Sequence, residues 1–399
     1  MKATLHKTLP KGIVNSVPSK SYGHRFIIAS MLSDSDVNID NIVLNDDIKA
    51  TLNALMYFGK KYEYINNRLS IRNNTTSFND VIVDCNESGS TLRFLIPIML
   101  TRFNNVSFLV SDRLINRGIG VYEKLFGKIG IKTNYKKNKI SFIGKLVSGN
   151  YSIPGDVSSQ FITGLLFSLC LLDGDSTLSI TTKIESVDYI YITLDVLNRF
   201  GISIDFKDNV FYIKGNQRYV GIDCFVEGDY SNASFIDAFN YFGGDIKILG
   251  LNINSYQGDK KYIEYFKMLS DGNPTINIEN QIDLGPILMA FASLNNGAKF
   301  TGTKRLKIKE SNRSSAMQEE LMKFNVKCDV NDNDIVIYKS DIDYDGRILN
   351  SHNDHRIVMA LSLFLVRYDI TIDGIEAVNK SYPSYFKTLE SVGVKIDYE

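Results

Sequence analysis

Apolar residues along this chain follow three patterns that recur in a fixed order. Some helical segments are apolar at nearly every position, for example SGSTLRFLIPIML and HRIVMALSLFL, which is typical of helices buried on all sides. Others carry apolar residues only at helical spacing, for example DYIYITLDVLNRFG, which predicts a helix with one buried face. Alternating segments joined by a polar turn such as KDN then follow, and these predict a β-hairpin.

This order occurs six times, at a spacing of roughly 70 residues for most copies. The surface helix of each copy stops at a residue suited to a left-handed helix cap: Gly59, Gly130, Gly201, Gly272, Asn325 and Gly393. Each copy is therefore predicted to be a β-α-β-α-β-β unit with one buried helix and one surface helix. The predicted fold class is α/β (α+β).

Six units divide naturally into two domains of three, because 399 residues exceed what one hydrophobic core usually supports. The sixth unit reaches Glu399 without a final strand, and the alternating segment ATLHKTL near the N-terminus is expected to supply it. By alternation, Leu5 and Leu9, or Thr4 and His6, should then face the core. We expect a first domain of residues 19–226 and a second of residues 1–18 and 227–399, with a hinge and a ligand cleft between them. The three units of the first domain are expected to be complete within residues 12–215.

Composition narrows the classes of function. The chain has 45 basic and 45 acidic residues, which argues against general binding of nucleic acid or anionic membranes, so any basic site must be local. No signal-peptide core or membrane-spanning apolar run is present. Four cysteines without CxxC spacing (Cys85, Cys170, Cys224 and Cys328) favour reduced thiols in a cytoplasmic protein.

Basic and small polar residues precede the buried helices at the same point of the repeat. Examples are PSKSYGHR with Lys20 and Arg25, GDVSSQ, and NDHR with Arg356. Cations in a first helical turn oppose the helix dipole, so their recurrence favours a site for a multiply charged anion over solvated charges beside ordinary caps. The stretch RLKIKESNR, the loop SDRLINRG and Lys380 add enough cations for two phosphorylated ligands. No metal-ligand cluster, P-loop or GxGxxG fingerprint is present, so no metal or nucleotide is expected.

With these motifs assembled, the sequence resembles the 5-enolpyruvylshikimate-3-phosphate synthase family along essentially the whole chain. The segments SKS with Arg25, SGSTLRFL, SSQFITGLL, VEGDYSNASF, QGD, KES with Arg313, NDHR and the KSYPSYF region occur in the family's order. The resemblance implies two enolpyruvyl transferase-like inverted α/β barrels that close on substrate. It also implies transfer of the enolpyruvyl group of phosphoenolpyruvate to the 5-hydroxyl of shikimate 3-phosphate, by addition and elimination, in the shikimate pathway towards chorismate. No cofactor, nucleic acid or membrane is implied, and we expect a cytoplasmic monomer.

The resemblance assigns roles by motif. The residues implied for shikimate 3-phosphate are Lys20, Ser21, Arg25, Ser158, Ser159, Gln160, Ser186, Tyr189, Asp283 and Lys309. Those implied for phosphoenolpyruvate are Lys20, Gly89, Arg117, Gln160, Arg313, Arg356 and Lys380. Asp283 is the implied base, with Lys20 and Glu310 the candidate acids. In NDHR, Asp354 and His355 are expected to shape the turn that aims Arg356.

Some positions depart from the family pattern, and two rival functions stay open on sequence. Glu87, Gly118, Arg305 and Asn312 replace the residues usual in the family, and VPSKS lacks a glycine. One rival is UDP-N-acetylglucosamine enolpyruvyl transferase, which usually carries a reactive cysteine in the loop written here SDRLINRGIGVY, where this chain has none. The other is a non-catalytic phosphoanion-binding repeat protein, against which the intact charged motifs argue.

Overall fold

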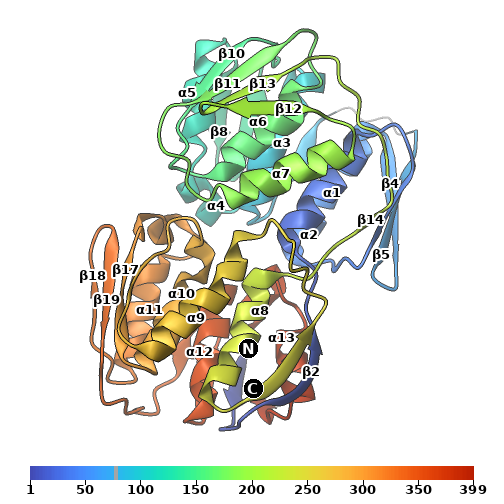
Figure 1. The fold of residues 1–399 in the computed structure, drawn as a ribbon. Helices are drawn as coiled ribbons and strands as arrows, with labels where there is room; N and C mark the ends of the chain where they lie inside the picture. The colour runs from blue at the N-terminus through green and yellow to red at the C-terminus, as the bar shows by residue number, and fades with distance from the viewer. Residues whose placement is uncertain (76–79) are drawn as a thin grey trace. The chain divides into compact units, whose positions relative to one another are not determined.

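The computed structural model describes residues 1–75 and 80–399. The chain folds into two compact units, one of Pro18–Glu227 and one of Met1–Val17 with Gly228–Glu399. The chain therefore crosses between units twice, and the sequence-based boundaries lie beside these two crossings. Each unit contains helices and sheets in the mixed arrangement expected for the α/β class (Figure 1).

In the described part of the unit Pro18–Glu227, each of three sheets has four strands in the same order. A parallel pair is extended by an antiparallel hairpin. The sheets are β14 (Cys224–Phe225), β3 (Val37–Asp40), β5 (Arg68–Asn73) and β4 (Lys60–Ile65); β6 (Ile82–Asp84), β7 (Asn105–Leu109), β9 (Lys139–Ile143) and β8 (Lys132–Lys136); and β10 (Asn150–Ile153), β11 (Ser176–Ile180), β13 (Val210–Ile213) and β12 (Ile204–Lys207).

The helices in the described part of this unit are α1 (Lys20–Leu32), α2 (Asp46–Leu52), α3 (Gly89–Arg102), α4 (Asp112–Arg117), α5 (Gly120–Lys128), α6 (Ser159–Leu169) and α7 (Asp188–Arg199), with the 3-10 helix η1 (Leu55–Phe58). Helix α3 packs against α6 and α1 against α7. Almost every residue of α3 and α6 is buried, which confirms the buried helices predicted from their continuous apolar runs.

The described part of the other unit has two four-stranded sheets and one two-stranded sheet. These are β16 (Thr275–Asn277), β17 (Gly297–Thr301), β19 (Asp334–Tyr338) and β18 (Cys328–Val330); β20 (Leu349–Asn350), β21 (Ile370–Asp373), β1 (Lys2–Leu5) and β22 (Ile396–Tyr398); and β15 (Asp245–Leu249) with β2 (Lys11–Asn15). Its helices are α8 (Tyr230–Asp237), α9 (Tyr262–Asp271), α10 (Gly285–Ser293), α11 (Arg313–Met322), α12 (His355–Ser362) and α13 (Tyr385–Ser391). Six 3-10 helices complete it: η2 (Ala238–Phe242), η3 (Gly258–Lys261), η4 (Ile282–Leu284), η5 (Lys304–Ile308), η6 (Leu363–Val366) and η7 (Ile375–Lys380).

Three details of the repeat differ from the prediction. The first repeat is not complete before the third one ends, because its edge strand β14 comes from Cys224–Phe225 and pairs in parallel with β3. The fourth repeat has only β2 and β15, since the segment NPTINIE supplies β16 to the next sheet instead of closing its own. The stop at Gly272 also has an extended φ of 173°, whereas Gly59, with a φ of 67°, is a left-handed cap as predicted.

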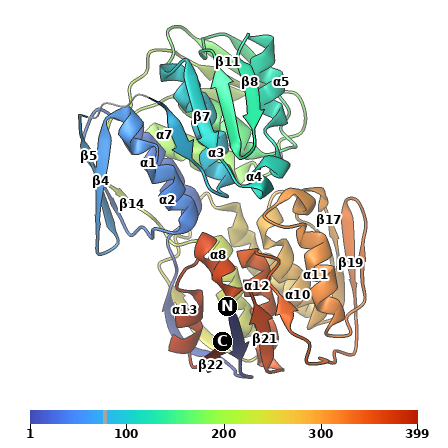
Figure 2. The same cartoon turned by 180° about the vertical axis from the view of Figure 1, so that it is seen from behind.

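The N-terminal segment pairs where its alternation predicts. Strand β1 lies between β21 and β22 and is antiparallel to both, so the two ends of the chain lie side by side (Figure 2). Ala3 and Leu5 are fully buried in this strand. The expectation for Leu9 is wrong, because the strand ends at Leu5 and Leu9 is 47% exposed.

Two features of the fold concern the redox state of the cysteines and the possibility of a membrane-spanning helix. All four cysteines are buried and free, and burial raises the pKa of the Cys170 thiol to about 12. Among the described residues, none of the helices combines the length and apolar character needed to cross a bilayer.

Candidate active site

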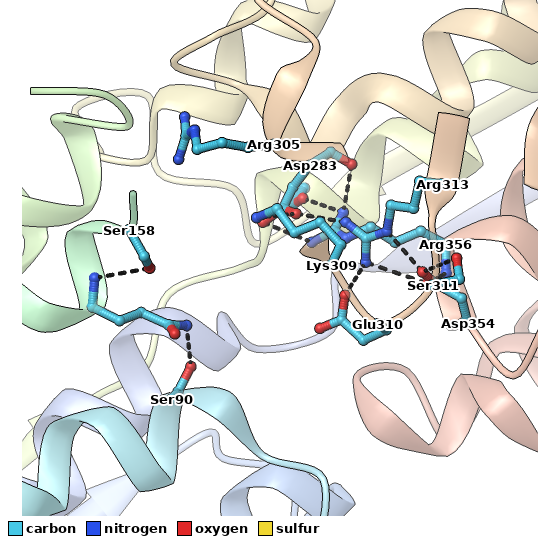
Figure 3. A network of polar contacts seen from close by, with 12 residues as sticks. Ser90, Ser158, Asp283, Arg305, Lys309, Glu310, Ser311, Arg313, Asp354 and Arg356 are labelled. Carbon is cyan, nitrogen blue, oxygen red and sulfur yellow. Dashed lines mark hydrogen bonds and ion pairs between the residues drawn. The ribbon is translucent and has the colours of Figure 1, made fainter. Parts of the chain in front are cut away.

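A buried arginine at the start of α11 gathers three carboxylates in the unit Met1–Val17 with Gly228–Glu399 (Figure 3). The Arg313 guanidinium donates to Asp354 Oδ2 at 2.8 Å, to Asp283 Oδ1 at 2.7 Å and to Glu310 Oε2 at 2.5 Å. Its side chain is 1% exposed. Burial alone would lower the pKa of Arg313, but the three carboxylates together raise it above its usual value. The arginine therefore stays charged and fixes three acidic side chains around one point.

Asp283 is itself surrounded by cations. Lys309 Nζ lies 3.1 Å from Asp283 Oδ1, and the Arg356 guanidinium lies 3.7 Å from Oδ2. Burial would raise the pKa of Asp283, but Lys309, Arg356 and Arg313 hold it well below its ordinary value. The carboxylate is ionised and can accept hydrogen bonds from a hydroxyl group. Burial also lowers the pKa of Lys309 to about 8 against the opposing effect of Asp283.

The NDHR motif begins helix α12 and orients Arg356. Asp354 caps the helix by accepting a hydrogen bond from the Arg356 backbone N–H at 3.0 Å, as the sequence predicts. The Arg356 guanidinium donates to Ser231 Oγ at 2.6 Å and to the Asp283 carbonyl at 3.1 Å. Burial and the Arg313 guanidinium act in opposite directions on the pKa of Asp354, and the net result is a lowered value. Asp354 therefore has two functions in the fold: it binds the Arg313 side chain, and it caps the N-terminus of α12.

Two further groups belong to this neighbourhood. Lys380, the last residue of η7, donates from Nζ to the Asn353 carbonyl at 2.8 Å, beside the capped turn. The buried carboxyl of Asp259, from the QGD motif, has its pKa raised to about 7 by burial and by the negative charge of Asp283, against the attraction of Arg356. The pKa of Asp259 therefore lies near neutral pH, and sequence reasoning assigned this residue no role.

In the unit Pro18–Glu227, Gln160 is held between two helices. Its Oε1 accepts from Arg93 at 2.8 Å and its Nε2 donates to Ser90 Oγ at 2.9 Å, both on α3. Ser158 caps α6 by accepting from the Gln160 backbone N–H at 3.3 Å. Arg93 is a positioning residue that sequence reasoning did not single out, although it lies in the SGSTLRFL motif.

Gly89 and Arg117 were both predicted on the phosphoenolpyruvate side, and the structure brings them together. A β-carbon added to Gly89 would lie 3.1 Å from the Arg117 guanidinium. A side chain at this point would therefore push the arginine away from the start of α3. The absence of a side chain at Gly89 lets the guanidinium lie directly against the helix N-terminus, which also favours anions.

Lys20 and Arg25, both on α1, have different surroundings. Lys20 Nζ forms an ion pair with Asp47 Oδ2 at 2.8 Å, and both side chains are less than one fifth exposed, at 17% and 15%. Arg25 is fully buried, and its guanidinium donates to Thr193 Oγ1, to the Ser21 carbonyl at 2.8 Å and to the Tyr189 carbonyl at 3.0 Å. Two of these bonds, to Thr193 and Tyr189, join α1 to α7.

The loops before α6 and α7 are joined to each other. Gly155 accepts a hydrogen bond from the Glu185 backbone N–H at 3.1 Å and donates to Thr182 Oγ1 at 2.8 Å. These contacts bring the loop of Ser158 and Ser159 beside the loop of Ser186, which is buried and has a φ of 55°. Ser158 and Ser159 follow the first of these loops at the start of α6, and Ser186 lies in the second loop.

The structure therefore assembles Asp283, Lys309, Glu310, Arg313 and Arg356 into one network and places Lys380 beside it. The residues of the other unit form local groups around Lys20, Arg25 and Gln160. Among the departures from the family pattern, Asn312 caps α11 by accepting from the Ser315 backbone N–H, so it keeps the capping function of an aspartate. Arg305 donates to the Glu279 carbonyl.

One group of possible metal ligands occurs among the described residues. The ligand atoms of Glu319, Glu320 and His352 lie within 4.8 Å of one another. Lys323 Nζ lies 2.8 Å and 3.0 Å from the two Glu320 oxygens. An ammonium group therefore already neutralises the buried carboxylate, and the group offers little to a metal ion.

Comparisons with known proteins agree on one family. A sequence profile described as EPSP synthase (3-phosphoshikimate 1-carboxyvinyltransferase) matches residues 7–389. A protein named 3-phosphoshikimate 1-carboxyvinyltransferase from Clostridium kluyveri is 38% identical, covering 99% of this chain and 98% of its own length. One with the same name from Clostridium novyi is 37% identical, covering 97% and 96%.

Solved structures show the same fold. A structure of EPSP synthase from Acinetobacter baumannii has a TM-score of 0.81 at 21% identity and covers 100% of both chains. The enolpyruvyl transferase NikO from Streptomyces tendae has a TM-score of 0.77 at 13% identity, covering 100% of this chain and 98% of its own. These likenesses confirm the predicted fold class, and the sequence matches confirm the predicted family. The chain belongs to the EPSP synthase (3-phosphoshikimate 1-carboxyvinyltransferase) family.

Proposed function

We propose that this chain transfers the enolpyruvyl group of phosphoenolpyruvate to the 5-hydroxyl of shikimate 3-phosphate and releases inorganic phosphate. The observation that carries the proposal is the charged network of Asp283, Lys309, Arg313 and Arg356, in a chain of this family. Such a network supplies an ionised acceptor for a hydroxyl and fixed positive charge for phosphate and carboxylate groups. Neither UDP-N-acetylglucosamine enolpyruvyl transfer nor non-catalytic anion binding is favoured by the family match.

The proposed reaction has two balanced steps. In the first, the 5-hydroxyl oxygen bonds to C2 of phosphoenolpyruvate, the hydroxyl proton is removed, and C3 gains a proton to give a tetrahedral intermediate. In the second, C3 loses a proton and the C2–phosphate oxygen bond breaks, which restores the double bond and releases phosphate. We assign the base to Asp283 and the acids to Lys20 and Glu310. Glu310 is bound to Arg313 and Lys20 to Asp47, so both are held in place.

The remaining predicted groups bind the substrates in this proposal. The shikimate 3-phosphate side uses the serines of the two joined loops, Gln160, Arg25 and Lys309. The phosphoenolpyruvate side uses Arg117 against Gly89, with Arg313, Arg356 and Lys380. Because Arg313 and Arg356 are already held by hydrogen bonds, their charge is in place before the anion arrives. We also propose a cytoplasmic location, which the free, buried cysteines support. We further propose a monomer, which a dimer mass by light scattering would contradict.

Turnover with different acceptors tests the function. Phosphate release should require both phosphoenolpyruvate and shikimate 3-phosphate. Release with UDP-N-acetylglucosamine but not with shikimate 3-phosphate would assign the chain to the first rival. Binding of either anion without release would favour the second.

Arg356→Lys should weaken phosphoenolpyruvate binding selectively. Lysine keeps the positive charge but loses the planar guanidinium, whose Nη1 donates to Ser231 and to the Asp283 carbonyl while Nη2 lies 3.7 Å from Asp283 Oδ2. We expect the KM for phosphoenolpyruvate to rise about tenfold, equivalent to about 1.4 kcal/mol, while binding of shikimate 3-phosphate alone is unchanged. The matched control is Arg367→Lys, an exposed arginine that donates to the Leu294 carbonyl in the same unit. Equal weakening of both substrates would contradict the assignment.

The pKa of Lys309 predicts an alkaline limit to binding of shikimate 3-phosphate. Burial lowers this pKa to about 8, so the ammonium is charged below that pH and loses its proton as the pH rises through it. The KM for shikimate 3-phosphate should therefore increase on the alkaline side. In Lys309→Arg the increase should disappear, because a guanidinium stays protonated throughout this range. Lys307→Arg, at the neighbouring lysine paired with Asp332, should leave the profile unchanged. An alkaline limit that persists in Lys309→Arg would assign it to another group.

A further inference from the structure

A second buried charge cluster lies at the other end of α11, away from Arg313. The side chain of Glu320 is fully buried, and its carboxylate accepts from Lys323 Nζ at 2.8 Å and 3.0 Å. Lys323 also donates to the Ile348 carbonyl at 3.0 Å. Burial would raise the pKa of Glu320, but its hydrogen bonds from His352, Lys323 and the Asn350 backbone lower it, so the carboxylate is ionised.

This carboxylate holds the turn that follows β20. Glu320 Oε2 accepts from the Asn350 backbone N–H at 2.9 Å, and Oε1 accepts from His352 Nε2 at 3.0 Å. We call Glu320, Lys323 and His352 the Glu320 clamp. His352 and Asn353 both have positive φ, at 50° and 51°, a conformation that non-glycine residues adopt at some cost and keep only when their surroundings impose it.

The turn held by the Glu320 clamp bears directly on the proposed substrate groups. Its next residue, Asp354, binds Arg313 and caps the helix that carries Arg356. The carbonyl of Asn353 accepts from Lys380 Nζ. Arg313 and Lys380 therefore contact the cap or the turn through their side chains, and Arg356 contacts the cap through its backbone N–H. Helix α11 is joined to the turn at both ends, through Arg313 at its start and through Glu320 near its end.

A general stabilising function does not account for this cluster. Buried ion pairs contribute little net stability, and apolar residues of similar size are often equally good or better, because of the cost of removing the charges from water. The charged cluster instead fixes the geometry of the turn. The two carboxylate oxygens of Glu320 hold the Asn350 backbone N–H and the His352 side chain at defined distances. That geometry matters most where a small displacement of a binding group costs activity.

We propose that Glu320, through Lys323 and His352, is a positioning residue for the phosphoenolpyruvate side of the reaction. The inference rests on the proposed function. The clamp holds the turn of residues 350–353 in its left-handed conformation, and the turn sets the positions of Arg356 and Lys380. Loss of the clamp should therefore disturb phosphoenolpyruvate binding and change binding of shikimate 3-phosphate, which also uses the serine loops of the other unit, much less.

Glu320→Gln tests this with Glu319→Gln as the matched control. Glutamine keeps the size but loses the charge that holds Lys323 and His352, whereas Glu319 is an exposed neighbour on the same helix. With rates normalised to folded protein, we expect Glu320→Gln to raise the KM for phosphoenolpyruvate about tenfold. The KM for shikimate 3-phosphate should stay within about twofold of wild type, and Glu319→Gln should match wild type.

A second variant covers the case in which Glu320→Gln does not fold. His352→Ala removes the partly exposed member of the clamp, and its side chain is 21% exposed, so folding should be preserved. It should raise the KM for phosphoenolpyruvate by roughly threefold, with His6→Ala, a histidine 30% exposed in the same unit, as the control without effect.

The outcomes separate the inference from the proposed function. A lower melting temperature with both KM values unchanged in every folded variant would make the clamp purely structural and overturn the inference. A parallel rise of both KM values would overturn it too. No turnover by the wild-type protein would refute the proposed function and the inference with it.

Discussion

Arg313→Met should abolish turnover and destabilise the unit Met1–Val17 with Gly228–Glu399 by about 3–5 kcal/mol. Methionine fills a similar volume but leaves Asp283, Glu310 and Asp354 without their shared cation in a site where Arg313 is 1% exposed. Uncompensated buried carboxylates are among the most costly defects in a folded protein. Urea unfolding of this unit, followed by hydrogen exchange, gives the free energy of unfolding.

The pH dependence of this loss has a definite sign. In the wild type, the pKa values of Asp283 and Asp354 are lowered, so the stability that these groups contribute is present at neutral pH and is lost as the pH falls through their folded values. Without Arg313 these pKa values rise, and the carboxyls can take up protons at higher pH. The difference in stability between wild type and Arg313→Met should therefore shrink as the pH falls below neutral.

Two controls accompany Arg313→Met. Arg347→Met removes an exposed arginine paired with Asp345 in the same unit and should leave the unfolding midpoint unchanged. Arg313→Lys keeps one charge and should fall between Arg313→Met and wild type in stability. Full activity in Arg313→Lys, or a wild-type midpoint in Arg313→Met, would show that the cluster does not depend on this guanidinium.

Deletion of residues 1–8 should destabilise the same unit by roughly 5 kcal/mol or more. Strand β1 is central in its sheet, pairs with both neighbours, and buries Ala3 and Leu5 completely. Its removal exposes the facing edges of β21 and β22, which are then prone to pair with other chains. The unit Pro18–Glu227 should keep its own unfolding transition and its hydrogen-exchange protection.

A matched pair of substitutions isolates the packing contribution of β1. Leu5→Ala should cost about 2–5 kcal/mol, because Leu5 is fully buried. Leu9→Ala, at a leucine 47% exposed beyond the end of the strand, should change stability by no more than about 0.5 kcal/mol. Equal effects of the two, or destabilisation confined to Pro18–Glu227, would contradict the pairing of β1.

Local patterns predicted most of the fold, and the exceptions depend on distant partners. Alternation and hairpin turns are local, so the sheets and the N-terminal strand were accessible from the sequence. Strand β14 is too short to show alternation, and its parallel pairing with β3 depends on residues far away in the chain. In the same way, Thr275–Asn277 has a strand pattern, but the sequence does not show which sheet it joins. Leu9 has the right spacing but lies past the strand end.

The residues of the candidate site also differ in whether the sequence could predict them. Motifs identified cationic residues such as Arg313 and Arg356, because a recurrence at helix starts is visible in one dimension. The partners of these cations could not be predicted, since the contact of Asp354 with Arg313 exists only where the starts of two helices meet. Arg93 and the Glu320 clamp contact other site residues, and no sequence motif or spacing identifies them. Asp259 is set apart by burial and by neighbouring charges, which the sequence does not reveal.

The most direct test of the proposed function is the identity of the product formed from shikimate 3-phosphate and phosphoenolpyruvate. Nuclear magnetic resonance of the reaction mixture should show a vinyl ether at the 5-oxygen of shikimate 3-phosphate, with inorganic phosphate formed in equal amount. Phosphate released without the vinyl ether, or a vinyl ether formed only when UDP-N-acetylglucosamine is the acceptor, would contradict the proposed function.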